Sequence, residues 1–144
     1  MITEDFVSFE TAKLLRDKGF NGVCYFIYRY DGIQFYCATH RAQPTTNKNI
    51  TEENEKNPKF KVHECTCPTQ QMAMKWLREV HHIFIDIDWD ARPEPKEFGN
   101  KPYFSLITNM NTNEFYSGKD LPGECASYEE ACETAIKYCL ENLI

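Results

Sequence analysis

The C-terminal segment, residues 128–144, carries the pattern that most constrains the fold. Apolar or small side chains recur there at alternating intervals of three and one residues, which places them on one face of an α-helix. The members of this stripe are Tyr128, Ala131, Cys132, Ala135, Ile136, Cys139, Leu140 and Leu143. Ser127 precedes the stripe and Glu130 follows three residues later, a capping box that begins the helix. This helix must bury one side against the rest of the protein.

Two more helices are expected nearer the N-terminus. Ser8 suits the N-cap of a helix over residues 9–18, and Gly19 suits its end. Pro68 and Thr69 suit the start of a helix over residues 68–80, and a short extended piece at residues 60–67 precedes it.

A β-hairpin is expected between these helices. Residues 23–30 and 33–39 are rich in β-branched and aromatic side chains, and an Asp-Gly pair joins them. A two-residue turn there pairs Tyr28 with Phe35 on the more apolar face. The opposite, mixed face then carries Tyr25, Ile27, Arg29, Gln34 and Tyr36.

The chemistry changes between about residues 40 and 61. This stretch is polar and has no period, so the sequence predicts a polar loop or insertion. Further along, apolar residues alternate with Asp86, Asp88 and Asp90, which is typical of a half-buried strand, here over residues 83–89. A second hairpin is expected over residues 102–109 and 114–117.

These elements predict an α+β fold in a single domain over residues 1–144. Three helices pack on a mainly antiparallel sheet of about five strands, in the order α-β-β-α-β-β-β-α. The 144 residues are 42% hydrophobic and 14% aromatic, which argues against disorder.

The net charge and the cysteine content limit the cellular settings and partners that fit the chain. The net charge of −6 disfavours binding to a nucleic-acid backbone. No run of eighteen apolar residues suggests a membrane span, and the acidic start Ile2–Asp5 lacks the features of a secretion signal. We therefore expect a cytoplasmic protein whose seven cysteines are reduced thiols.

Two clusters could hold a metal ion. His63, Cys65 and Cys67 alternate, and with His81 they offer four zinc ligands. The spacing lacks the Cys-x₂-Cys signature of zinc sites, so buried thiols and a histidine favoured by the helix end explain these residues better.

The Asp86, Asp88 and Asp90 row could instead hold Mg²⁺ or Mn²⁺ for a phosphoesterase or nuclease. Acids on an edge strand also discourage aggregation, and alternation alone explains the row, so we favour that interpretation. No catalytic set and no phosphate-binding glycine loop are recognisable.

Three stretches carry a family resemblance: Ile2–Glu10, Pro68–His81 and Ser127–Ile144. With them the chain resembles a widespread family of short uncharacterised proteins found in gut bacteria, their phages and mobile elements. The resemblance implies a cytoplasmic setting and a phage or mobile-element origin. It carries no activity and no site residues.

The leading hypothesis is a small acidic, non-enzymatic binding protein that acts by protein–protein interaction without a cofactor. Exposed aromatics beside charges favour contact through Tyr25, Ile27, Arg29 and Tyr36, with Asp86, Asp88 and Asp90 as further candidates. The alternatives are the Mg²⁺- or Mn²⁺-dependent phosphoesterase or nuclease and an acidic mimic of nucleic acid. The partner protein and the oligomeric state stay open.

Overall fold

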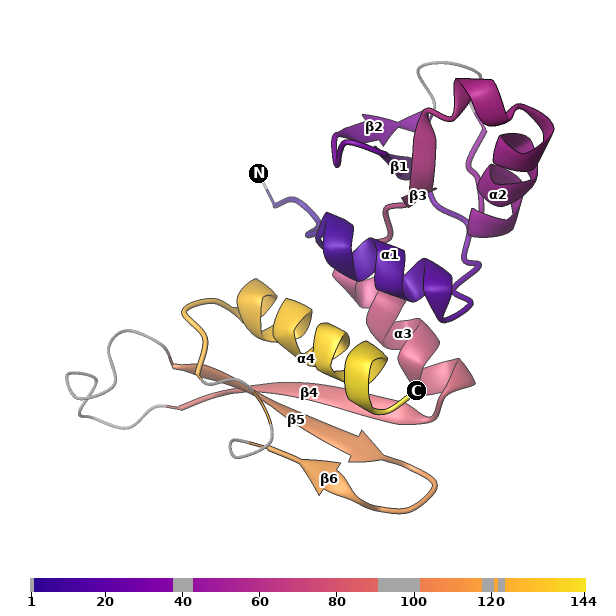
Figure 1. Cartoon of the computed structure of the whole chain (residues 1–144). Coiled ribbons are helices and arrows are strands. Elements are labelled where there is room, and N and C mark those ends of the chain that lie inside the picture. Colours follow the sequence, from indigo (N-terminus) through magenta and orange to yellow (C-terminus); the bar gives the residue numbers. More distant parts are fainter. Residues whose placement is uncertain (1, 38–42, 91–101, 118–120, 122–123) are drawn as a thin grey trace. The chain divides into compact units, whose positions relative to one another are not determined.

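In the part of the chain that the structure describes, all strand pairs are antiparallel, and they form two separate sheets (Figure 1). This computed structural model describes residues 2–37, 43–90, 102–117, 121 and 124–144. Within them it has four α-helices and two three-stranded sheets, so the predicted α+β class is confirmed. The sequence predicts one domain, and the structure has two units within it, Met1–Met72 and Ala73–Ile144.

The first unit is built around the sheet β2-β1-β3. Its strands and helices, in chain order, are α1 (Phe9–Asp17), β1 (Phe26–Arg29), β2 (Gln34–Tyr36), α2 (Asn47–Lys56), the 3₁₀ turn η2 (Pro58–Phe60) and β3 (His63–Thr66). The predicted N-cap of α1 is confirmed, because the Ser8 hydroxyl accepts the Thr11 N–H at 3.2 Å.

Helix α1 packs on the face of this sheet that carries Tyr28. The Tyr28 hydroxyl donates to the Val7 carbonyl at 2.6 Å, and its ring lies 5.3 Å from the Phe9 ring. Ala12 and Leu15 are fully buried on the inner side of α1. The amphipathic spacing that predicts this helix therefore also identifies the side that it buries.

The prediction of three helices is wrong, because α2 forms inside the stretch expected to be a polar loop. Of its ten residues only Asn47 and Ile50 are buried, so no apolar stripe announces it. The Asn47 amide donates to the Phe20 carbonyl at 2.8 Å and accepts the Thr66 N–H at 2.9 Å. Hydrogen bonds from one buried side chain thus hold α2 against its neighbours, and a periodicity argument does not detect them.

The expected hairpin is present, but its register differs by one residue. Tyr28 pairs with Gln34 rather than Phe35. The Arg29 N–H donates to the Ile33 carbonyl and the Gly32 N–H to the Arg29 carbonyl, both at 2.9 Å, so the turn has three residues. Gly32 takes the left-handed conformation that such a turn needs, at φ +83°. A one-residue shift turns every β2 side chain to the opposite face.

The single five-stranded sheet is also wrong. Strand β3 forms in the piece expected only to be extended, and it pairs with β1 through Ile27–Thr66 and Tyr28–Cys65. It therefore completes a separate sheet with the first hairpin. A β-bulge between Tyr28 and Arg29 interrupts this pairing, so the residues of β3 do not keep the simple alternation expected of them.

The second unit contains the sheet β4-β5-β6 and helix α4. Helix α3 (Gln70–Val80) begins in the first unit and ends in the second, followed by β4 (Ile83–Trp89), β5 (Tyr103–Asn109), β6 (Phe115–Tyr116) and α4 (Tyr128–Asn142). Strands β4 and β5 pair along seven residues without a break. Figure 1 shows α4 over one face of this sheet, where it contacts β4 and β5.

The helix predicted from the C-terminal stripe is confirmed. Six residues of α4 are buried, namely Ala131, Cys132, Ala135, Ile136, Cys139 and Leu140. The Glu130 N–H donates to the Ser127 hydroxyl at 3.1 Å, and the Glu130 carboxylate accepts the Ala126 N–H at 3.0 Å. The Ser127 half of the predicted capping box is therefore in place, whereas the Glu130 carboxylate reaches one residue past the N-cap.

No helix in the described ranges is long and apolar enough to cross a membrane. All seven cysteines are thiols rather than disulfides.

Candidate interaction surfaces

The four hairpin residues expected to share one face do not form a common surface. Ile27 is only 4% exposed and belongs to the core. Tyr25 and Tyr36 are exposed, but they lie on opposite faces, because the observed register pairs Tyr36 with Phe26. The Tyr36 ring accordingly packs 5.0 Å from the ring of Phe26.

Arg29, the fourth of these residues, is tied into the turn. Its guanidinium forms an ion pair with Asp31 at 2.8 Å and lies 5.3 Å from the centre of the Phe35 ring. It also lies 6.0 Å from the centre of the Tyr30 ring. The side chain of Arg29 is 29% exposed, so it braces the end of the hairpin and still reaches solvent.

A different group of apolar side chains is exposed at this end of the sheet. Tyr30 is 61% exposed, Ile33 52% and Val62 45%. The Tyr30 N–H donates to the Val62 carbonyl at 3.2 Å, so these two residues lie side by side, and Ile33 follows across the turn, where its carbonyl accepts the Arg29 N–H. We call Tyr30, Ile33 and Val62 the tip surface. Grouped exposed apolar residues are more informative than scattered ones.

Sequence reasoning missed the tip surface, although a signal was present. Tyr30 and Ile33 flank the turn, where a strand has no further neighbour to pack against. With a two-residue turn they appear as the last facing pair of the hairpin. The three-residue turn instead leaves Tyr30 inside the loop and beside Val62, whose position depends on β3.

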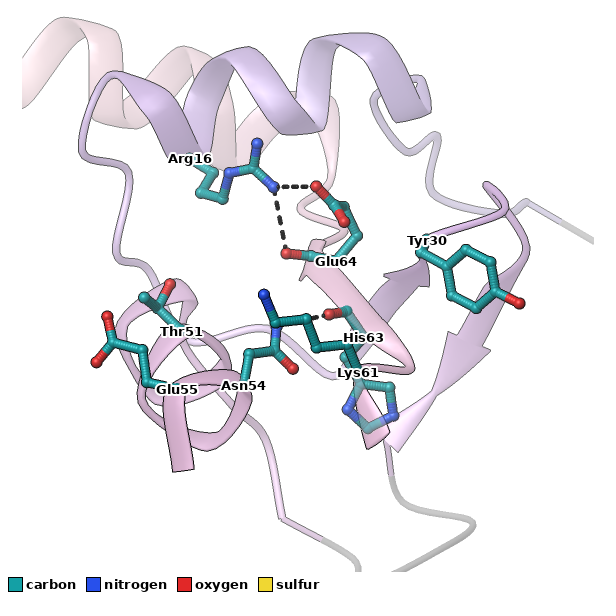
Figure 2. Close-up of a pocket in the computed structure, with 8 residues that line it drawn as sticks. All are labelled: Arg16, Tyr30, Thr51, Asn54, Glu55, Lys61, His63 and Glu64. Carbon is teal, nitrogen blue, oxygen red and sulfur yellow. Dashed lines mark hydrogen bonds and ion pairs between the residues drawn. The ribbon is translucent and has the colours of Figure 1, made fainter. Parts of the chain in front are cut away.

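A polar hollow of about 650 Å³ lies beside the tip surface. It is lined by Arg16, Tyr30, Thr51, Asn54, Glu55, Lys61, His63 and Glu64. Figure 2 shows Thr51 and Glu55 at one side, on α2, and Tyr30 at the other, with Lys61 and His63 between them. The walls therefore come from α1, α2, β3 and the hairpin turn.

The charges of this hollow are largely balanced by its own residues. Arg16 forms an ion pair with Glu64 at 2.6 Å and donates to the Glu64 carbonyl at 3.3 Å. Its guanidinium also meets Asp17 at 3.0 Å. Burial lowers the pKa of Arg16, but the hydrogen bonds to Glu64 and Asp17 outweigh burial and leave that pKa raised. These contacts tie α1 to β3 and show no preference for one charged ligand.

The aspartate row lies where the alternation predicts it. Asp86 and Asp88 are exposed and pair across the sheet with Leu106 and Phe104 of β5. Asp90 follows the end of β4 and is half-buried. Adjacent members are two residues apart on an extended strand, about 7 Å, so they do not converge on one point by themselves.

The four candidate zinc ligands are not gathered into a site. Burial raises the pKa of the Cys65 thiol to about 12, so it stays protonated at neutral pH. Cys67 is buried nearby in the first unit, whereas His81 follows α3 in the second. Across the described ranges, no three His, Cys, Asp or Glu side chains are placed to hold a metal ion.

No family model, no curated protein and no solved structure matches the chain. The resemblance drawn from the sequence therefore stays a prediction.

Proposed function

We propose that this chain is a non-enzymatic binding protein that contacts a partner protein through the tip surface. The observation that carries the proposal is the exposure of Tyr30, Ile33 and Val62, each 45% or more, around the turn end of the first sheet. Water contacts apolar groups there that a partner could bury at about 25 cal/mol per Å². Tyrosine is also among the residues enriched at protein interfaces.

The residues around the tip surface are held in place, so a partner would meet an ordered surface. Arg29 is held by Asp31 and by two aromatic rings, and Tyr30 is anchored through its backbone to Val62. Side chains on an ordered turn lose less conformational entropy on binding than those on a loose loop. Lys61, beside Val62, adds an exposed cation at the rim.

The proposal includes the setting that the sequence resemblance implies. If the chain comes from a phage or mobile element, its expected partner is a protein of the bacterial host. This part rests on analogy with the family and not on the geometry of the tip surface. The metal-dependent and nucleic-acid-mimic alternatives stay predictions, and no contact in the described residues favours either.

Affinity capture with a matched pair of variants tests the proposal. Tyr30→Ser, Ile33→Thr and Val62→Thr together remove the tip surface. A control of equal size replaces three exposed apolar residues elsewhere, Val23→Thr, Val80→Thr and Met110→Thr. Each protein serves as bait in lysate from cells that carry the gene, and bound proteins are quantified by mass spectrometry.

We expect at least one protein to be captured equally by the wild type and the control, and about tenfold less by the tip variant, which corresponds to 1.4 kcal/mol. Equal capture by all three baits would overturn the tip surface as the contact. Capture by none of them would count against a binding function.

A further inference from the structure

Strand β4 is an edge strand of its sheet. The pattern of its hydrogen bonds to β5 determines which of its backbone groups point away from the sheet. The Asp90 N–H donates to the Pro102 carbonyl and the Met110 N–H to the His82 carbonyl, both at 2.8 Å. The β4–β5 register places both pairs directly opposite each other. Hydrogen-bonded pairs alternate in an antiparallel ladder, so even-numbered residues of β4 bond to β5. The N–H and C=O groups of Ile83, Ile85 and Ile87 therefore point away from the sheet.

These outward groups have no backbone partner within the described ranges. Strand β4 pairs with β5 alone there, and none of the other backbone hydrogen bonds involves Ile83, Ile85 or Ile87. The next outward N–H, that of Trp89, is accepted by the Asp88 carboxylate at 2.8 Å. One end of the edge is thus closed by a side chain. The other end is covered, because Ile83 is only 2% exposed, which leaves Ile85 and Ile87 as the positions that can accept another strand.

The two faces of β4 differ in chemistry. Ile83 and Ile85 are buried on the face that α4 covers. Phe84, Asp86 and Asp88 are exposed on the opposite face. A strand beside β4 would place alternate side chains next to each of these rows.

We propose that the outer edge of β4 binds an extended segment of another protein that carries Lys or Arg at alternate positions, facing Asp86 and Asp88. Main-chain hydrogen bonds to Ile85 and Ile87 extend the sheet, which is strand addition. Cross-strand pairs of opposite charge set the register and select a basic segment. Apolar residues at the intervening positions continue the row of Ile83 and Ile85. This inference does not rest on the tip surface.

A second copy of the chain fits this edge poorly. In the antiparallel register that pairs the whole of β4 with itself, Ile83 lies opposite Trp89 and Asp86 lies opposite Asp86 of the other copy. Like charges directly opposite each other destabilise a strand pair. The carboxylates therefore disfavour self-pairing and favour a basic partner.

Amide hydrogen exchange of the full chain, followed by NMR, tests the proposal. The probe is a synthetic nine-residue peptide in which valine alternates with lysine, and the comparison peptide alternates valine with glutamate. We expect the lysine peptide to slow exchange at Ile85 and Ile87 at least tenfold and to leave residues of the first unit unchanged. The glutamate peptide should slow none of them.

A variant with reversed charges on β4 gives the most discriminating test. In Asp86→Lys/Asp88→Lys the preference should switch to the glutamate peptide, a gain that misfolding cannot produce. The matched control Glu52→Lys/Glu53→Lys, on the exposed side of α2, should keep the preference for lysine. Equal protection by both peptides, protection at other amides, or an unchanged preference in the aspartate variant would overturn the proposal. Slowed exchange at these amides through self-association, in the absence of peptide, would also overturn the proposal.

Discussion

The two units build similar sheets by different means. In the second unit β4 and β5 pair along seven residues, and one fifteen-residue helix covers them with a row of apolar side chains. In the first unit the longest described strands have four residues, and α2 is held by the hydrogen bonds of Asn47 and Asn54 and by the buried Ile50. Apolar periodicity therefore dominates one unit, and individual polar contacts and turn geometry dominate the other.

Removing apolar bulk from α4 should have the largest effect. Ile136 is fully buried, so Ile136→Ala leaves a cavity and should lower the free energy of unfolding by about 3–4 kcal/mol. Urea unfolding followed by circular dichroism measures the change. Lys137→Ala, at the next and more exposed position, should cost less than about 0.5 kcal/mol. A cost below about 1 kcal/mol for Ile136→Ala would show that the stripe does not hold the second unit.

In the first unit the matching test removes a buried polar side chain. Asn47→Ala leaves the Phe20 carbonyl and the Thr66 N–H without their hydrogen bonds and should cost about 2–3 kcal/mol. Hydrogen exchange at the Thr66 amide should accelerate in parallel. Asn49→Ala, on the exposed side of the same helix, serves as the control. Equal, small effects of both substitutions would contradict the role given to Asn47.

Turn geometry provides the next test. Gly32 has φ +83°, and an added Cβ would lie 3.2 Å from Cδ1 of Phe9. Gly19 has φ +92° with nothing within 4 Å of an added Cβ. Gly19→Ala should cost about 1 kcal/mol from backbone strain alone, and Gly32→Ala should cost more. Thermal unfolding compares the two. A larger loss for Gly19→Ala would mean that the three-residue turn is not formed as described.

The smallest expected effect concerns pH in the second unit. Burial lowers the pKa of His81, and neighbouring His82 lowers it further. Nε2 of His81 is buried without a hydrogen-bond partner in the described part of the chain. The unfolded chain, with a pKa of about 6.5, then binds more protons below that pH, so stability is full above it and declines as the pH falls. His81→Gln should weaken the decline of unfolding free energy between pH 7.5 and 5. An unchanged slope would contradict this role.

The difference between the two units also explains which elements could be predicted from the sequence. Helix α4 and strand β4 were predicted correctly, because long elements repeat their apolar period often enough to be recognised. The sequence does not predict helix α2, because only Asn47 and Ile50 of its ten residues are buried, too few for an apolar period. The hairpin was recognised, but its register depends on whether the turn has two or three residues, and Asp-Gly fits both. That single shift moved Tyr36 to the other face.

The same difference between regular strands and turn-dependent geometry applies to the candidate sites. The exposed faces of Asp86 and Asp88 follow from simple alternation along a regular strand. The tip surface requires a turn type, a β-bulge and the pairing of β3 with β1 to be known together. Long-range pairing of this kind leaves no periodic trace in the sequence.

The proposed function requires that the exposed apolar residues at the end of the first sheet are not needed for folding. The free energy of unfolding of the Tyr30→Ser/Ile33→Thr/Val62→Thr variant, measured in urea, tests it most directly. We predict a loss of less than about 1.5 kcal/mol, as for three surface substitutions. A loss of about 4 kcal/mol or more would show that these side chains belong to the core.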